Sequence, residues 1–538
     1  MKSHTFFRRW ATLAAAALLL TAPACVKDLD RTPFYDLNTE SVYRDPANYI
    51  QVLAKLYAGF NLSGQTTTGS SDVSGSDEGA SSYLRAYWKV QELPTDEAVV
   101  AWNDGAIQAL NTITWTSGND YVRLAYNRIF YEIAICNEFI RETTDDKLSS
   151  RGITGNDAAN ARLYRAEARF LRALAYYHAL DLYGSVSFVT EAQAPGKFLP
   201  NQISRAELFA YVESELKAVE SALAAPRQPG YGRADQAAAW TLLAKLYLNA
   251  QVYTGTARYT DAITYCNKVL TAGYALVPQY RNLFLADNGT TSQSEIIFPL
   301  TADGRRSQGY GGTTYLVHAA VGGRMLASSF GVNGGWAGNR TRRNLPLLFP
   351  ALTGGPDQRA MFFTVGQSLE INDLIKFTDG YAVTKYRNVT STGTPGSDPT
   401  GTFVDTDFPL FRLADVYLMY AEAVVRGGSG GSAATALSYV NQLRRRGYGL
   451  PLDAPSAAAD VTALSEDFLL AERARELYWE AHRRTDLVRF GKFTGSSYVW
   501  PWKGNVAVGR GVAATFDLYP IPSTDLTANP NLKQNPGY

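Results

Sequence analysis

Histidine and cysteine, the residue types that most often bind zinc or act as redox groups, are scarce in this chain of 538 residues. The four histidines are His4, His178, His318 and His482, and no HExxH motif, CxxC motif or Cys/His cluster occurs. Residues 427–431 (GGSGG) fit the G-x-S-x-G pattern of serine hydrolases, but they join two expected helices, whereas a nucleophile elbow follows a strand. No phosphate-binding G-x-x-x-x-G-K-[ST] loop is found. We therefore predict no metal site and no cofactor.

Paired carboxylates remain as candidates for acid–base chemistry. Asp96 and Glu97 are adjacent and could supply the two carboxyl groups that flank the scissile bond in a glycoside hydrolase. Glu472, Glu476 and Glu480 could do the same, but positions four apart lie on one face of a helix. The arginines close enough in sequence to pair with these three glutamates are Arg473, Arg475, Arg483 and Arg484. We therefore predict an ion-paired helix there and keep Asp96 and Glu97 as the alternative catalytic pair.

The first residues have the pattern of a bacterial secretion signal. Basic residues precede an apolar run over residues 10–20, and small residues then lead to Cys25. A run of roughly a dozen apolar residues is too short for a bilayer, which needs about 20. Cys25 stands where a lipoprotein has its acylated cysteine. We predict that residues 1–24 are a lipoprotein signal peptide and that lipid on Cys25 anchors the protein in a membrane.

The mature chain carries little net charge. After Lys2, Arg8 and Arg9 leave with the signal peptide, 48 basic side chains face 50 acidic ones, a net charge of −2 with histidine neutral. This balance argues against a nucleic-acid partner. Cys136 and Cys266 lie in apolar, helix-like stretches, so we expect two buried thiols and no disulfide between them.

The elements that would position these residues are mostly helical. Apolar residues recur at spacings of three and four, and the periodic stretches fall in pairs separated by short polar or glycine-containing turns. In residues 234–272, Trp240, Leu243 and Tyr247 mark one helix, and a turn at Gly255 leads into the next. Such pairs are typical of tetratricopeptide-like scaffolds, although the repeats have no constant period. We expect helices near residues 40–60, 121–144, 158–183, 204–224, 234–252, 259–272, 409–426, 433–446 and 465–490.

Two long segments interrupt this helical pattern. Residues 61–120 and about 285–405 are rich in Gly, Ser, Thr, Asn and aromatic residues, and they show little helical period. Loops of this length are uncommon in a compact domain unless they have a function. Aromatic side chains beside glycine and asparagine favour a binding surface there: Tyr83, Tyr87, Trp88, Trp102, Trp115, Tyr310, Tyr315 and Trp336.

Long, ordered strings near the C-terminus resemble a known family. They are residues 411–423 (FRLADVYLMYAEA), 436–444 (ALSYVNQLR) and 472–491 (ERARELYWEAHRRTDLVRFG), with closing motifs at 519–522 (YPIP), 529–532 (NPNL) and 534–538 (QNPGY). These strings resemble the SusD/RagB family of nutrient-binding outer-membrane lipoproteins. Shorter strings at 95–97 (TDE), 102–105 (WNDG), 115–116 (WT) and 133–137 (IAICN) extend the resemblance over nearly the whole mature chain.

The resemblance implies a mostly α fold, in which a tetratricopeptide-like scaffold of helical pairs is decorated with long irregular loops and a few short strands. It implies one SusD-like domain over residues 25–538. The N-terminal part, about 25–285, would carry helical repeats and a ligand-facing loop at 61–120. The C-terminal part, about 286–538, would hold the irregular segment 285–405 and the closing helices.

The resemblance also implies a function: capture of oligo- or polysaccharides at the cell surface, without catalysis, and delivery to a SusC-like TonB-dependent outer-membrane transporter. Family glycan sites use aromatic residues, because sugar rings stack on Trp and Tyr while their hydroxyls need polar partners. We therefore expect Trp102 with Asn103, and Tyr315 with Trp336, to bind the glycan. Three alternatives stay open: binding of peptides or other nutrients, a surface glycoside hydrolase using Asp96 and Glu97, and an adaptor without a small ligand.

Overall fold

The computed structural model describes residues 39–67, 70–193, 196 and 198–538. The expected signal peptide, residues 1–24, and the expected lipidation site Cys25 lie outside the described residues. Tyr49–Tyr538 form one compact unit, separate from the residues before them. Helix α2 (Thr39–Val42) and the start of α3 (Ala47–Gly59) precede this unit, which holds all the other elements.

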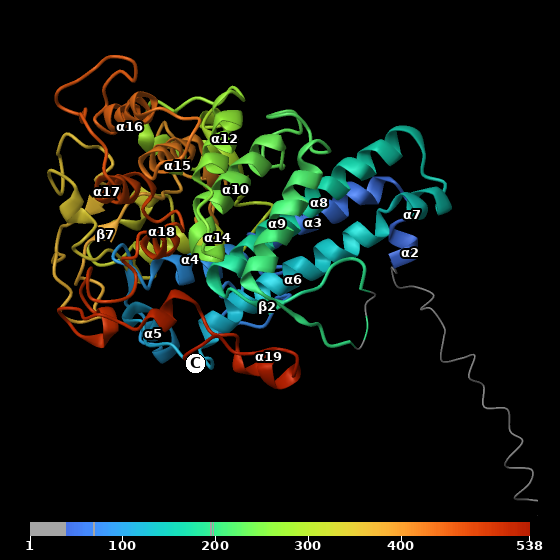
Figure 1. Cartoon of the computed structure of the whole chain (residues 1–538). Coiled ribbons are helices and arrows are strands. Elements are labelled where there is room, and N and C mark those ends of the chain that lie inside the picture. The colour runs from blue at the N-terminus through green and yellow to red at the C-terminus, as the bar shows by residue number, and fades with distance from the viewer. Residues whose placement is uncertain (1–38, 68–69, 194–195, 197) are drawn as a thin grey trace, which may run out of the picture. The chain divides into compact units, whose positions relative to one another are not determined.

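The compact unit is mostly helical and its strands are short, as predicted (Figure 1). After α3, the helices are α4 (Tyr83–Glu92), α5 (Gly105–Thr112), α6 (Asp120–Glu142), α7 (Asp145–Ser150), α8 (Gly155–Leu182), α9 (Arg205–Glu220), α10 (Gln236–Leu248), α11 (Ala250–Thr254), α12 (Tyr259–Leu270), α13 (Asn288–Thr291), α14 (Gly312–Ala320), α15 (Leu413–Val425), α16 (Ala433–Gly447), α17 (Glu466–Leu477), α18 (Arg483–Arg489) and α19 (Ser523–Ala528). The strands pair two by two: β1 (Val99–Val100) with β5 (Asn339–Arg340), β2 (Val186–Ser187) with β3 (Gln202–Ile203), β4 (Ile296–Leu300) with β8 (Phe408–Arg412), and β6 (Phe362–Phe363) with β7 (Ala382–Val383).

Several of the helices that pack together are near neighbours along the chain, whereas α12 and α15 are far apart in sequence. α6 packs on α8, α8 on α9, α10 on α12, α12 on α15 and α15 on α16. Figure 1 shows α6, α8 and α9 side by side. Small side chains permit the close approach of these helices: Ala237, Ala238 and Ala244 of α10 are fully buried. This arrangement confirms the predicted scaffold of helical pairs.

The helix expected from residue 409 begins later than predicted. Phe408–Arg412 instead form β8, which pairs antiparallel with β4. All five residues of β8 are buried, and α15 begins at Leu413, whose N–H donates to the Glu295 carbonyl at 3.0 Å. The start was placed too early because a buried strand and a buried helix both read as a continuous apolar run.

The single helix expected over residues 465–490 is two helices. Residues 478–482 separate α17 from α18, and Trp479 adopts a left-handed backbone with φ 64°. Buried polar contacts hold this break: Trp88 Nε1 donates to the Trp479 carbonyl at 3.0 Å, and Trp479 Nε1 donates to the Glu97 carbonyl at 3.1 Å. These tertiary contacts override the local preference for a continuous helix.

Both segments expected to be irregular contain helices. α4 and α5 lie within 61–120, and α14 lies within 285–405. Every residue of α4 and α14 is buried, although α4 includes charged side chains such as Arg85 and Lys89. The two helices are only 10 and 9 residues long and lie among Gly-, Ser- and Thr-rich stretches, where so short a helical pattern is hard to distinguish. Five of the aromatic residues expected at a binding surface are core residues instead: Tyr83, Tyr87, Trp88, Trp115 and Tyr315.

Cys136 on α6 and Cys266 on α12 are buried free thiols, which confirms the prediction. None of the described helices combines the length and apolar character needed to cross a bilayer. Within the described ranges, no group of three or more His, Cys, Asp or Glu side chains is placed to hold a metal ion.

Candidate ligand-binding site

An open cavity with aromatic walls lies in the compact unit, and its volume is about 550 Å³. We call it the aromatic cavity, and its lining residues are Asp77, Glu78, Arg85, Trp102, Tyr310 and Trp336. Small-molecule sites in proteins have volumes of roughly 300–1,000 Å³ and combine apolar walls with a few polar groups. The aromatic cavity has the size and the lining of such a site.

A two-stranded sheet brings the two tryptophans of this cavity together. β1 ends just before Trp102 and β5 begins just after Trp336, and the antiparallel pairing places Val100 opposite Asn339. The indole Nε1 of Trp102 donates to the backbone carbonyl of Trp336 at 3.1 Å, although the two residues are 234 positions apart. The sheet therefore builds one aromatic surface from both segments that the sequence had marked as irregular.

The Trp102 ring is held from behind by Tyr315 of α14. The two rings meet edge to face, with centroids 6.0 Å apart and planes at 62°. The Tyr315 hydroxyl donates to Asn339 Oδ1 at 3.0 Å, which fixes the tyrosine in turn. A ring held in this way loses little freedom when a ligand binds.

His318, also on α14, supports the second tryptophan. Its imidazole stacks on the Trp336 indole, with centroids 4.8 Å apart and 22° between the planes. The ring nitrogens Nδ1 and Nε2 lie 2.7 and 2.9 Å from the carbonyl oxygens of Gly334 and Thr402. Burial lowers the pKa of His318, although the two carbonyl contacts act in the opposite direction. The His318 ring therefore supports one face of the Trp336 indole.

Arg85 of α4 lines the aromatic cavity and links two of its walls. Its Nη1 and Nη2 donate to the two carboxylate oxygens of Asp77 at 2.8 and 2.9 Å, and Nη1 also donates to the Tyr310 carbonyl at 3.3 Å. Burial would raise the pKa of Asp77, but the charges of Arg85 and Lys89 outweigh it and lower the pKa. Asp77 is therefore an anion at neutral pH, able to accept hydrogen bonds from ligand hydroxyls.

Lys89, four residues after Arg85 on α4, is buried among the same rings. Its Nζ lies 4.2 Å from the ring centre of Tyr121, 5.4 Å from that of Tyr315 and 5.7 Å from that of Trp102. The amine has no hydrogen-bond partner in the described part of the chain. Burial, followed by the charge of Arg85, lowers the pKa of Lys89 well below its usual value. Lys89 supports the aromatic wall from within the core.

The structure brings two of the four predicted glycan contacts into one cavity. Trp102 and Trp336 both line it. Asn103 is exposed next to Trp102 but is not a lining residue. Tyr315 is 0% exposed, so its prediction needs correction: it supports the Trp102 ring and offers no surface to a ligand.

Of the other residues that line the aromatic cavity, the sequence indicated one and missed three. Tyr310 stood among the aromatic residues of the second irregular segment and lines the cavity as that pattern suggested. Asp77, Glu78 and Arg85 were missed. Their place depends on α4 and the loop before it, and the periodicity of the sequence did not reveal that helix.

The alternative catalytic pair is buried away from solvent. Asp96 and Glu97 are 1% and 2% exposed. Arg483 donates to both carboxylate oxygens of Asp96 at 2.7 Å, and the Tyr498 hydroxyl donates to one of them at 2.6 Å. Burial raises the pKa of Glu97 to about 8, against the opposing charge of Arg483. A glycosidic bond has no access to either carboxyl group here, so this pair does not form an active site in the structure.

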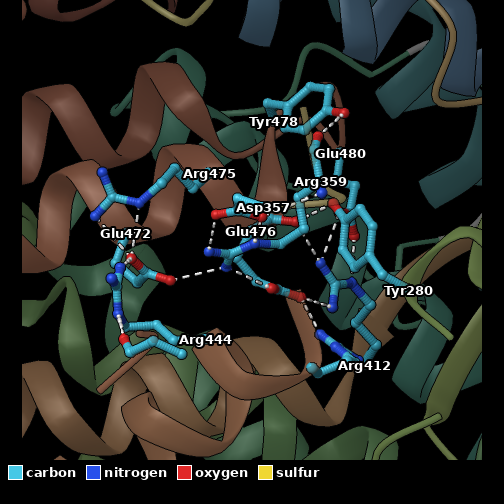
Figure 2. A network of polar contacts seen from close by, with 12 residues as sticks. Tyr280, Asp357, Arg359, Arg412, Arg444, Glu472, Arg475, Glu476, Tyr478 and Glu480 are labelled. Atoms are coloured by element: carbon cyan, nitrogen blue, oxygen red, sulfur yellow. Dashed lines mark hydrogen bonds and ion pairs between the residues drawn. The ribbon is translucent and has the colours of Figure 1, made fainter. Parts of the chain in front are cut away.

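The three glutamates predicted on one helix belong to a buried ion network (Figure 2). Glu472, Glu476 and Glu480 are 0% exposed, and Glu480 lies in the break after α17. Most of the ion-pair partners of these glutamates come from distant segments. Of the neighbouring arginines expected to pair with them, only Arg475 does so, with Glu472 at 2.7 Å. The partners are Lys385, Arg359, Arg412, Arg444, Arg446 and Arg475.

Arg359 shows how this network is built. It donates to Asp357 at 2.8 Å, to Glu472 at 2.8 Å and to Glu476 at 3.1 Å (Figure 2). Burial would raise the pKa of Glu476, but the surrounding arginines, Arg446 first, outweigh it and hold the pKa at about 2. The network is a structural core of paired charges and does not border the aromatic cavity.

Comparison with known proteins decides the family. The chain is 35% identical to the starch-binding protein SusD of Bacteroides thetaiotaomicron, with 100% of both chains covered, and residues 247–538 match the model of the SusD family. This chain belongs to the SusD family. Another SusD-like relative, protein P2 of Formosa agariphila, is 25% identical over 74% of this chain and 78% of its own.

Solved structures of SusD-like proteins have the same fold. A SusD homologue from Bacteroides thetaiotaomicron matches with a TM-score of 0.71 at 21% identity, and the match covers 93% of this chain and 99% of that one. Surface glycan-binding protein A from the same species, solved in complex with laminarihexaose, matches with a TM-score of 0.67 at 17% identity over 91% and 99%. These likenesses confirm the SusD-family fold that the C-terminal strings predicted.

Proposed function

We propose that this SusD-family protein captures a glycan in the aromatic cavity. The observation that carries the proposal is the meeting of two fixed tryptophans, Trp102 and Trp336, with the charged pair Arg85 and Asp77 in one open cavity. A sugar ring has an apolar C–H face that stacks on aromatic rings, and hydroxyl groups that need donors and acceptors. The walls of the cavity offer both.

A starch-type α-glucan is the first ligand to test. The relative that is 35% identical over its whole length is named a starch-binding protein. Two structural neighbours, at 22% and 17% identity, are described as binding laminarin or as a complex with laminarihexaose. A laminarin oligosaccharide is therefore the comparison ligand.

We also propose that the protein binds its glycan without catalysis and passes it to a SusC-like TonB-dependent transporter at the outer membrane. The burial and ion pairing of Asp96 and Glu97 support the absence of catalysis. Membership of the SusD family and the expected lipid on Cys25 support the transporter partner and the surface location.

Titration calorimetry of the mature protein tests the site, with maltoheptaose, a laminarin oligosaccharide and a set of peptides as ligands. We expect Trp102→Ala and Trp336→Ala each to weaken glycan binding by roughly two- to tenfold, because one aromatic contact contributes roughly 0.5–1.5 kcal/mol. Phe198→Ala is the control, since Phe198 is an aromatic residue that is 42% exposed and lies outside the cavity.

Three other results would contradict the proposed site or favour an alternative function. Glycan binding that survives both tryptophan substitutions would contradict the site. Binding of peptides in place of glycans would favour the peptide-uptake alternative. Glycan hydrolysis that disappears in Asp96→Asn would favour the hydrolase.

A further inference from the structure

A second cavity of about 300 Å³ opens between α3 and the turn that contains Tyr231 and Gly232. One wall is a stripe along α3, where Ala54 and Tyr57 face the space at helical spacing. The opposite wall is formed by Tyr231, Arg233 and Thr301. Its volume is at the lower end of the range for small-molecule sites.

This second cavity is a close neighbour of the aromatic cavity. Ser307 and Leu62 line the second cavity, and Tyr310 lines the aromatic one. Leu62 packs against Gly309, where an added Cβ would lie 3.2 Å from Leu62 Cδ2. The chain segment from Ser307 to Tyr310 therefore contributes to both cavities.

The walls of the second cavity are fixed by contacts made on their far sides. The Tyr231 hydroxyl donates to Asp407 Oδ2 at 2.9 Å, and Asp407 Oδ1 accepts from the Ala302 N–H at 2.8 Å. The Tyr57 hydroxyl donates to Glu167 at 2.5 Å. Both phenol groups are therefore occupied, and the tyrosines offer their rings to the space.

The polar groups of the second cavity suit a neutral ligand with hydroxyls. Arg233 donates through Nε to Glu167 at 3.1 Å and pairs with the same carboxylate through Nη2, so its charge is compensated. Within the described residues, Arg233 Nη1 makes no hydrogen bond, and its side chain is 27% exposed. The exposed Thr301 adds a hydroxyl at the rim. Among the residues that the structure describes, no acidic side chain lines the second cavity.

We propose that this second cavity is a further glycan subsite, occupied by a more distant part of the same polysaccharide chain that lies in the aromatic cavity. The inference rests on the proposed function. Two linked contacts on one ligand raise the effective concentration at the second contact, so a long chain binds more tightly than a short one. The subsite selects polymers over short oligosaccharides.

Ala54→Trp tests the subsite by filling it from the exposed surface of α3. Gln51→Trp, at an exposed position of the same helix outside the cavity, is the matched control. The probes are amylopectin, which can reach both cavities, and maltotriose, which fills one. We expect Ala54→Trp to weaken amylopectin binding by on the order of tenfold and to leave maltotriose binding and the Gln51→Trp control unchanged. Thr301→Trp, from the opposite wall, should have the same effect.

If both filling variants bind amylopectin as the wild type does, the subsite is refuted while glycan capture stands. If maltotriose binding falls by the same factor as amylopectin binding, the second cavity is not a separate subsite, and the inference is refuted as well. If the wild type binds neither probe, α-glucan capture fails and this subsite for α-glucan chains fails with it.

Discussion

Single residues behind the aromatic cavity fix the positions of its aromatic rings. Gly338, which lies against Trp102, is the clearest case. A Cβ at this position would lie 2.8 Å from Trp102 Cε2, which is closer than real contacts allow. We expect Gly338→Ala to displace the indole and weaken glycan binding roughly five- to tenfold, because the platform is no longer preorganised.

The neighbouring Gly334 provides the matched control for that change. A Cβ added to Gly334 meets nothing within 4 Å. Gly334→Ala should bind glycan as the wild type does, and near-ultraviolet circular dichroism of the tryptophans should change only in Gly338→Ala. Equal affinity in both variants would show that the orientation of Trp102 does not limit binding.

Glu132 on α6 carries a protonated carboxyl group at neutral pH. It is 0% exposed, and burial raises its pKa from 4.5 to about 8, although the charge of Arg128 opposes this. The folded state holds the proton of Glu132 more tightly than the unfolded state does. The contribution of this proton to the unfolding free energy is therefore complete below pH 4.5 and is lost as the pH rises to about 8.

We therefore expect Glu132→Gln, which cannot ionise, to gain stability relative to the wild type between pH 4.5 and pH 8, by on the order of a few kcal/mol. Urea unfolding of both proteins at pH 5 and pH 8 measures the change. A difference in unfolding free energy that is the same at both pH values would mean that Glu132 is ionised in the folded protein.

At the scale of elements, the buried ion network joins α17 and the break after it to β8. Arg412 at the end of β8 donates to Glu476 at 2.7 Å, to Glu480 at 2.6 Å and to Glu295 at 3.0 Å. Removing one partner from a buried ion cluster leaves uncompensated charge, which costs about 3–5 kcal/mol. We expect Arg412→Met to lower the unfolding free energy by that amount in urea titrations.

An exposed ion pair supplies the comparison for that prediction. Arg162 and Asp145 lie 2.9 Å apart, and their side chains are 52% and 61% exposed. Arg162→Met should change the unfolding free energy by about 1 kcal/mol or less. If the two substitutions cost the same, the network contributes no more than a surface pair.

At the scale of the whole molecule, the expected lipid on Cys25 decides where the protein resides. We expect Cys25→Ser to move the protein from the membrane fraction to the soluble fraction, because several acyl chains supply the anchor. Cys266→Ala changes a buried thiol and keeps Cys25, so it should stay in the membrane fraction. Immunoblots of fractionated cells distinguish the two, and retention of Cys25→Ser in the membrane would contradict lipid anchoring.

Much of the fold could be predicted because most helices present one apolar stripe to a neighbour. The ranges 121–144, 158–183 and 433–446 correspond closely to α6, α8 and α16. Two helices that escaped prediction, α4 and α14, are only 10 and 9 residues long and lie within Gly-, Ser- and Thr-rich stretches, so their helical pattern is too short to stand out.

The site could be predicted only in part for a related reason. Trp102 and Trp336 stood out by residue type, and the structure places them in one cavity. The sequence could not show that Tyr315 stands behind Trp102, which depends on the long-range pairing of β1 with β5, nor that Arg85 lines the cavity, which depends on the packing of α4 on α14. Residue type identified candidates, whereas tertiary pairing determined which of them reach a ligand.

The C-terminal residues complete the core around residues 90–115. Trp479 Nε1 donates to the Glu97 carbonyl, the Tyr519 hydroxyl donates to the Val90 carbonyl, and Trp115 Nε1 donates to the Tyr538 hydroxyl. Contacts between such distant residues raise the contact order, and the loops must close before the contacts contribute energy, so folding is slow. If the expected signal peptide directs the chain across a membrane N-terminus first, this core cannot close until residues 479–538 have emerged.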